Sequence, residues 1–204
     1  MSRSLAVEVF AEDAAHEAFL VPFIRRVAME EDASVDVRVR SAVGGHGRAM
    51  SEFDLFQKTL LQRHLATPDL VVICIDANCK KHAQARREIE DQAVSSLHEC
   101  MIIASPDPHI ERWYMADPEG FALVAGATPP TKRRKCGRDV YKALLRNAIH
   151  QAGHLAPLGG IEFAPELVER MDLFRAGKND KSLKAFTDEL KSVLIRVMSS
   201  SGTS

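Results

Sequence analysis

Long hydrophobic runs are absent from this sequence. No apolar stretch approaches the roughly 18 residues that a membrane-spanning helix needs. The first four residues, Met-Ser-Arg-Ser, lead directly into a strand-like segment rather than into the apolar centre of a signal peptide. We therefore expect a cytoplasmic protein that is neither exported nor in contact with a membrane.

Cysteine is scarce and scattered. Cys74, Cys79, Cys100 and Cys136 lie too far apart for paired zinc ligands, and we expect them to be reduced thiols. The eight histidines include no H-E-x-x-H pattern. Both observations argue against a zinc site.

An excess of charge of one sign is also missing. Lys and Arg number 27 and Asp and Glu number 28, so the whole chain carries no general signal for nucleic acid. Any basic surface must be local. With 204 residues, 46% of them hydrophobic, the chain is long enough for a real core without disulfides.

The chain is organised around the segment LVVICIDAN, residues 70–78. Its unbroken apolar part, 70–75, predicts a central parallel strand that is buried on both faces. Asp76 follows this strand directly, and ligands of parallel sheets bind beyond the carboxyl ends of the strands. Asp76 is therefore a candidate for chemistry, although capping of the next helix is an alternative role.

Further strands and helices alternate along the first part of the chain. The pattern predicts strands at 5–10, 34–39, 70–75 and 100–104, and helices at 14–27, 52–64, 81–98 and 109–117. This alternation predicts a three-layer α/β fold with a mostly parallel sheet. Beyond residue 125 we expect helices only, at 139–152, 164–175 and 182–197. The expected organisation is thus an α/β core over 1–125, a helical extension over 126–198 that packs on it, and a disordered tail over 199–204.

Three carboxylates follow predicted strands. Glu12, Asp76 and Glu111 belong to separate strand-to-helix junctions, which converge on one rim of a parallel sheet. Gathered carboxylates repel one another unless a cation joins them, and Mg²⁺ or Mn²⁺ suits such a site. Asp76 and Asn78 are expected to share the metal, with Glu12 as a further ligand or as the acid or base. Metal-assisted phosphoryl transfer or phosphodiester cleavage is the chemistry that this set favours.

Other residues are candidates with a structural alternative. His16, four residues after Glu12, is either a general acid or base or a surface or capping histidine. Trp113 stacks on a nucleic-acid base or, as we favour, packs in the core. Arg48 in a Gly-rich loop, Arg112 beside Glu111 and the basic run 132–135 are candidate phosphate contacts. That run consists of Lys132, Arg133, Arg134 and Lys135.

The residues that follow the first, third and fourth strands resemble those of the TOPRIM-like proteins of the DUF4276 family. The resemblance rests on Glu12, on the segment Asp76-Ala77-Asn78, and most specifically on Glu111-Arg112-Trp113 with Ala116-Asp117. It implies a TOPRIM fold and a Mg²⁺-dependent nuclease that cleaves DNA or RNA. It also implies an AAA or ABC-type ATPase partner and a place in prokaryotic anti-phage defence.

Two departures from that family pattern leave other functions open. The family's E-G-x-T-E reads Glu12-Asp13-Ala14-Ala15-His16 here, and its second D-x-D carboxylate is replaced by Asn78. A site with one carboxylate fewer holds Mg²⁺ more weakly. The alternatives are a catalytically weakened subunit that binds an ATPase or nucleic acid without cleaving, and a phosphotransfer enzyme or phosphatase for small molecules. The oligomeric state stays open, and a homo-oligomer is compatible with the sequence.

Overall fold

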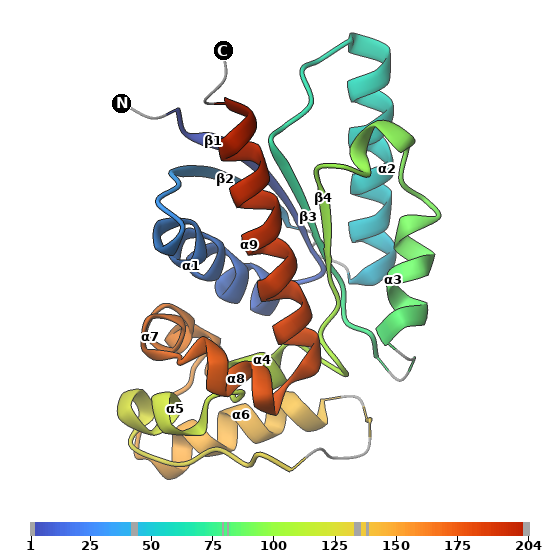
Figure 1. Ribbon diagram of the computed structural model, residues 1–204. Helices are drawn as coiled ribbons and strands as arrows, with labels where there is room; N and C mark the ends of the chain where they lie inside the picture. Colours follow the sequence, from blue (N-terminus) through green and yellow to red (C-terminus); the bar gives the residue numbers. More distant parts are fainter. Residues whose placement is uncertain are drawn as a thin grey trace.

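The computed structural model describes residues 3–41, 45–78, 80, 82–132, 136–137 and 139–201. Its centre is a four-stranded sheet in the order β2-β1-β3-β4, and every neighbouring pair is parallel. The strands are β1 (Leu5–Ala11), β2 (Val35–Ser41), β3 (Leu70–Cys74) and β4 (Met101–Ala104). Helices cover both faces of this sheet, which confirms the predicted three-layer α/β fold (Figure 1).

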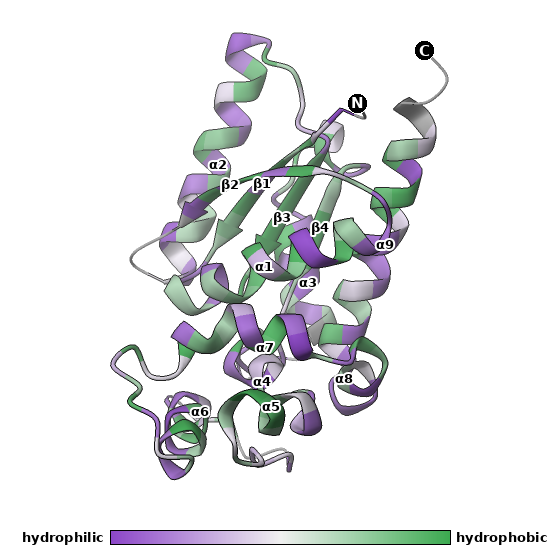
Figure 2. Ribbon diagram, turned by 90° about the vertical axis from the view of Figure 1, so that its left-hand side faces the viewer, coloured by the Kyte–Doolittle hydropathy of each residue, from purple (hydrophilic) through white to green (hydrophobic). Residues whose placement is uncertain are grey.

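The strands form a sheet because their side chains fill two separate cores. All five residues of β3 are buried, as expected for a strand covered on both faces. Along β1 the side chains alternate: Val7 and Val9 belong to one core and Phe10 to the other. In Figure 2 the inner strand β3 and its neighbour β4 are coloured as continuously hydrophobic, whereas the edge strand β2 alternates with hydrophilic residues.

Long helices lie on each side of the sheet (Figure 1). Helices α1 (Ala14–Glu30) and α9 (Lys181–Ser201) cover one face, and α2 (His46–Arg63) and α3 (His82–Glu90) cover the other. Asp13 is the N-cap residue of helix α1: its carboxylate accepts hydrogen bonds from the backbone N–H of Ala15 and of His16.

The shorter helices gather at the carboxyl ends of the strands, below the sheet in Figure 1. Trp113 lies there at the junction with α9: its indole stacks on Phe186 and its Nε1 donates to Ser182, so the favoured interpretation of Trp113 as a core residue is confirmed. The shorter helices at the carboxyl ends are α4 (Glu111–Tyr114), α5 (Pro118–Ala125), α6 (Val140–Gln151), α7 (Ala164–Arg170) and α8 (Leu173–Asn179), with a 3-10 turn at η2 (Ile161–Phe163). A second 3-10 turn, η1 (Ser95–Leu97), precedes β4.

Three predicted helices have different bounds in the structure. Helix α2 begins at His46 rather than at 52, because Ala49 and Met50 pack in the second core. Helix α3 ends at Glu90 rather than at 98, because the side chain of Gln57 forms hydrogen bonds with the backbone of Gln92 and of Val94 just after it. The helix expected over 164–175 is two helices, since the backbone N–H of Asp172 donates to Asp117 and its carboxylate caps α8.

Two further expectations change. Helix α9 continues to Ser201, so residues 199–201 of the expected tail are helical, and 202–204 lie outside the described residues. Cys74 and Cys100 are free thiols, but Cys136 is disulfide-bonded, so the expectation of four reduced thiols is wrong at Cys136. Cys79 lies outside the described residues.

In the described part of the chain, no helix is long and apolar enough to cross a membrane.

The strand order locates the natural ligand site. From β1 the chain passes through α1 to β2 on one side, and it returns through α2 to β3 on the other side. The order of strands therefore reverses between β1 and β3, and ligands of such sheets bind in the crevice beyond the carboxyl ends of those two strands. Glu12 and Asp76 stand at this place.

Candidate functional site

The three predicted carboxylates line one cavity. Glu12 directly follows β1, Asp76 lies two residues beyond β3, and Glu111 opens α4. The cavity has a volume of about 390 Å³ and lies at the switch point of the sheet. Its lining residues are Glu12, Asp13, Asp76, Asn78, His109, Glu111, Cys136, Asp139, Tyr141 and Lys142.

Glu12 and Asp76 are joined directly. The backbone N–H of Asp76 donates to Glu12 Oε2 at 3.0 Å, and the backbone N–H of Glu12 donates to Cys74 O at 3.2 Å. Burial, together with the negative charge of Asp76, raises the pKa of Glu12. Glu12 is therefore a carboxylate that gains from a nearby cation.

His16 lies beneath this pair and is fully enclosed, with 1% of its surface exposed. Its Nδ1 lies 2.7 Å from Asp13 Oδ1, and its Nε2 lies 3.0 Å from Asp76 Oδ1. An ionised carboxylate only accepts hydrogen bonds, so both ring nitrogens carry protons and His16 is an imidazolium. Burial alone lowers its pKa, but the charges and hydrogen bonds of Asp76 and Asp13 outweigh burial and raise it to about 10.

Asp76 has three hydrogen-bond partners through its carboxylate. Its Oδ1 accepts from His16 Nε2 and from the backbone N–H of Ile110 at 2.8 Å, and its Oδ2 lies 2.8 Å from His109 Nδ1. Burial by itself raises the pKa of Asp76, yet the neighbouring His16 and His109 bring the pKa below its usual range. Asp76 stays ionised and fixes the orientation of both histidines.

His109 is a site residue that the sequence did not single out. Its Nδ1 donates to Asp76, while its buried Nε2 has no partner in the described part of the chain. The hydrogen bond to Asp76 is the main cause that raises the pKa of His109. The only available signal in the sequence was its position two residues before Glu111, at the same strand-to-helix junction.

Glu111 is buried, with 2% of its surface exposed, and its Oε2 has no partner among the described residues. Burial raises the pKa of Glu111. A buried carboxyl group without a partner is costly, and such groups occur where a proton or a ligand is exchanged.

Asn78 lines the cavity but differs from the expected metal ligand. It is exposed, its backbone is left-handed with φ of 52°, and its Nδ2 donates to the backbone carbonyl of Asp76 at 3.2 Å. In this arrangement the amide of Asn78 stabilises the turn after β3. It does not act with Asp76 as a second oxygen donor to a metal ion.

The donor set fits a hard cation. Ligand atoms of Glu12, His16 and Asp76 lie within 4.8 Å of one another. His16 is excluded as a ligand while both of its nitrogens are protonated, so the available donors are carboxylate oxygens. Glu12, with its raised pKa, is the donor whose buried charge a divalent ion would compensate, with Asp76 as its neighbour, and the unpartnered Glu111 Oε2 belongs to the same cavity.

The predicted phosphate contacts that the structure describes, Arg48, Arg112 and Lys132, do not line the cavity. Arg48 is exposed on α2, pairs with Glu52 at 3.0 Å and is not among the lining residues. Arg112 donates from Nε to Asp180 at 2.5 Å and from Nη2 to Asn179 O at 2.9 Å. Lys132 is exposed, and Arg133, Arg134 and Lys135 lie outside the described residues.

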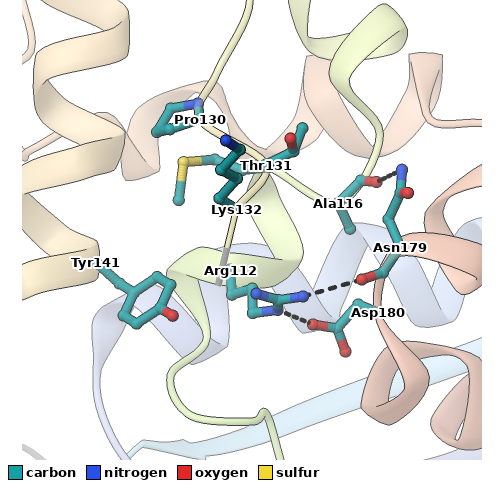
Figure 3. A pocket seen from close by; sticks show the side chains of 9 residues that line it. Arg112, Ala116, Pro130, Thr131, Lys132, Tyr141, Asn179 and Asp180 are labelled. Atoms are coloured by element: carbon teal, nitrogen blue, oxygen red, sulfur yellow. Dashed lines mark hydrogen bonds and ion pairs between the residues drawn. The ribbon is translucent and has the colours of Figure 1, made fainter. Parts of the chain in front are cut away.

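Figure 3 shows Arg112 held by Asp180 and Asn179, with Tyr141 and Lys132 beside it. The pocket among them has a volume of about 20 Å³, which is room for one water molecule. Tyr141 lines both this pocket and the larger cavity, so the two adjoin.

Comparison with protein-family models, with curated proteins and with solved structures finds no match to this chain.

Proposed function

We propose that the chain is a Mg²⁺-dependent nuclease that cleaves phosphodiester bonds in DNA or RNA, of the kind that the resemblance to TOPRIM-like DUF4276 proteins implies. The observation that carries the proposal is the convergence of Glu12, Asp76 and Glu111 on one cavity at the switch point of a parallel sheet. Enclosed carboxylates at this place suit a divalent cation together with the oxygens of a phosphate.

Glu12 and Asp76 would hold Mg²⁺ or Mn²⁺, with Glu111 facing the same cavity. A divalent ion bound here supplies an activated nucleophile and neutralises charge on the leaving oxygen. His16 contributes by keeping Asp76 ionised and in place. Lys142, which lines the cavity and lies 3.5 Å from Asp13, offers a cation for a substrate phosphate.

Two groups of the chain can move a proton in this site. Glu111 holds a proton more readily than an ordinary glutamate, so it is suited to protonate the leaving oxygen. His109 is oriented by Asp76 through Nδ1, so its unpartnered Nε2 is the nitrogen that gains or releases a proton.

The occupied state of Asp76 favours one alternative, a catalytically weakened subunit that binds an ATPase or nucleic acid without cleaving. Both carboxylate oxygens of Asp76 already have partners, and the imidazolium of His16 already supplies a cation beside them. Asn78 adds a neutral side chain where a second carboxylate would strengthen metal binding.

The cellular setting belongs to the same proposal. We place the chain in the cytoplasm as part of an anti-phage defence system, working with an AAA or ABC-type ATPase subunit. Co-purification of the tagged chain with such an ATPase from a host that carries both tests this part, and its absence at all salt concentrations would contradict it.

The decisive experiment is a cleavage assay on plasmid DNA, single-stranded DNA and total RNA across a Mg²⁺ and Mn²⁺ titration. We expect Asp76→Asn and Glu111→Gln to lower the rate by about 100-fold or more. Asp54→Asn, on the exposed surface of α2, is the matched control and should retain full activity. Full activity of Asp76→Asn would overturn the proposal, and no cleavage by the wild type despite ATPase binding would support the non-cleaving alternative.

A further inference from the structure

A second cavity adjoins the first. It has a volume of about 220 Å³, and it shares Asp13, Glu111 and Lys142 with the larger cavity. Its remaining lining residues are Ala14, Ala15, Leu158, Gly159 and Ile161. We propose that this second cavity binds the base of a nucleoside whose phosphate occupies the first cavity.

The chemistry of the two cavities is different. Carboxylates dominate the first, which has one histidine, whereas small and aliphatic side chains form most of the second. Sites for small organic groups have such apolar walls with a few polar groups placed at one side. The polar groups here are the three at the shared boundary, Asp13, Glu111 and Lys142.

The boundary residues point to a ligand that spans both cavities. Glu111 is buried and its Oε2 has no partner in the part of the chain that the structure describes. Lys142 is exposed, with 57% of its side chain accessible, and its contact with Asp13, at 3.5 Å, is long for an ion pair. A phosphate ester across this boundary would place its anionic part near Lys142 and the polar edge of its organic part near Glu111.

The apolar wall has room that the chain itself does not use. Gly159 has φ of +79°, which favours glycine, and no atom lies within 4 Å of the position of an added Cβ. Leu158 next to it has 64% of its surface exposed. An aromatic base with apolar faces and a polar edge would cover Leu158 and reach the boundary groups at once.

The first turn of α1 does not provide an anion site in this second cavity. Asp13 Oδ1 already accepts from the backbone N–H of Ala15 and from that of His16. A phosphate therefore belongs in the first cavity, and the second is left for the uncharged part of the substrate. This assignment rests on the proposed function, since it assumes that a phosphate binds beside the carboxylates.

The test is calorimetric binding of AMP, CMP, ribose 5-phosphate and inorganic phosphate to the full chain in the presence of Mg²⁺. We expect the two nucleotides to bind about tenfold more tightly than ribose 5-phosphate, which has no base. Ala14→Leu, which fills the exposed edge of the second cavity, should remove this difference and leave binding of inorganic phosphate unchanged.

Leu158→Asp should also remove the preference for nucleotides. Leu155→Asp is its matched control, because Leu155 is also exposed, at 84% against 64% for Leu158, in the same connecting segment but does not line the cavity. Equal affinity for nucleotides and ribose 5-phosphate in the wild type, or equal effects of the two leucine variants, would overturn the inference alone. Failure of every phosphate compound to bind would overturn the inference and the proposed function together.

Discussion

His16 shows how one side chain can set the charge of the whole site. It lies buried between Asp13 and Asp76, and each of its nitrogens faces a carboxylate. The three groups together carry a net charge of −1, and the positive imidazolium compensates one of the two buried carboxylates, which lack the bulk water that would otherwise solvate them. This unit keeps Asp76 ionised, and it also reduces the need of Asp76 for a metal ion.

The same histidine predicts how stability depends on pH in metal-free buffer. Folding raises the pKa of His16 from 6.5 to about 10, so its contribution is complete below pH 6.5 and is lost as the pH rises to about 10. The lowered pKa values of Asp13 and Asp76 change the stability only at acid pH. We expect the free energy of unfolding, measured by urea denaturation, to fall between pH 6.5 and 10 by at most about 1.4 kcal/mol per pH unit.

His16→Gln should reduce this slope over the same range, leaving the part that the raised pKa of His109 contributes, whatever its effect on stability at a single pH. His150→Gln, on the exposed surface of α6, is the control and should keep the slope. A wild-type protein whose stability does not change from pH 6.5 to 10 would contradict the assignment of His16 as an imidazolium.

We expect replacement of Glu111 to lower activity without lowering stability. Its buried carboxyl group lacks a partner for Oε2 among the described residues, and the neutral amide of Glu111→Gln removes the cost of burying a charge. We expect the variant to equal or exceed the wild type in stability by about 1 kcal/mol at pH 8. A stability loss larger than that in urea denaturation would show that Glu111 is a structural residue.

At the scale of elements, α9 is anchored by one buried carboxylate. Asp180 accepts from the backbone N–H of Ser182 and of Leu183, and it also pairs with Arg112. This contact joins the start of α9 to α4, which carries Glu111. Because α9 covers one face of the sheet, the anchor connects the stability of the fold with the position of the site.

We therefore expect Asp180→Ala to lower the free energy of unfolding by about 3 kcal/mol, because it removes a helix cap and leaves Arg112 without its carboxylate. Asp188→Ala, at an exposed position of the same helix, should change it by less than about 0.5 kcal/mol. Urea denaturation of both variants measures the difference, and equal effects would contradict the anchoring role.

The elements also show what the sequence can and cannot predict. Buried strands such as β3 were predictable because an unbroken apolar run has few other uses, and the strand-to-helix junctions followed from strand direction. The early end of α3 depends on the side chain of Gln57, which is 35 and 37 residues away from the two backbone groups that it holds. Pairings of this kind leave no periodic signal in the sequence.

The site was predictable to a similar degree. Glu12, Asp76 and Glu111 were identified because they follow strands, and the structure places them around one cavity. His109 was not singled out, because its importance depends on a hydrogen bond to Asp76 from another junction. Arg112 beside Glu111 suggested a phosphate contact, but the structure pairs it with Asp180, which lies 68 residues further along the chain.

At the scale of the whole molecule, the excess of carboxylates at one end of the sheet predicts that divalent cations stabilise the folded state. An ion that binds only the folded chain stabilises it by about 2.7 kcal/mol at a concentration 100 times its dissociation constant. We expect Mg²⁺ to raise the melting temperature of the wild type and EDTA to reverse the rise.

Glu12→Gln should lose most of this response, because Glu12 is a carboxylate whose raised pKa reports an uncompensated charge. Glu88→Gln, at a position of α3 where 40% of the side chain is exposed, separates site binding from general screening of surface charge. An equal rise of the melting temperature in both variants would mean that the cation acts on the surface charge. The carboxylates at the ends of β1 and β3 would then stabilise the fold through their interaction with His16 and would bind no metal ion.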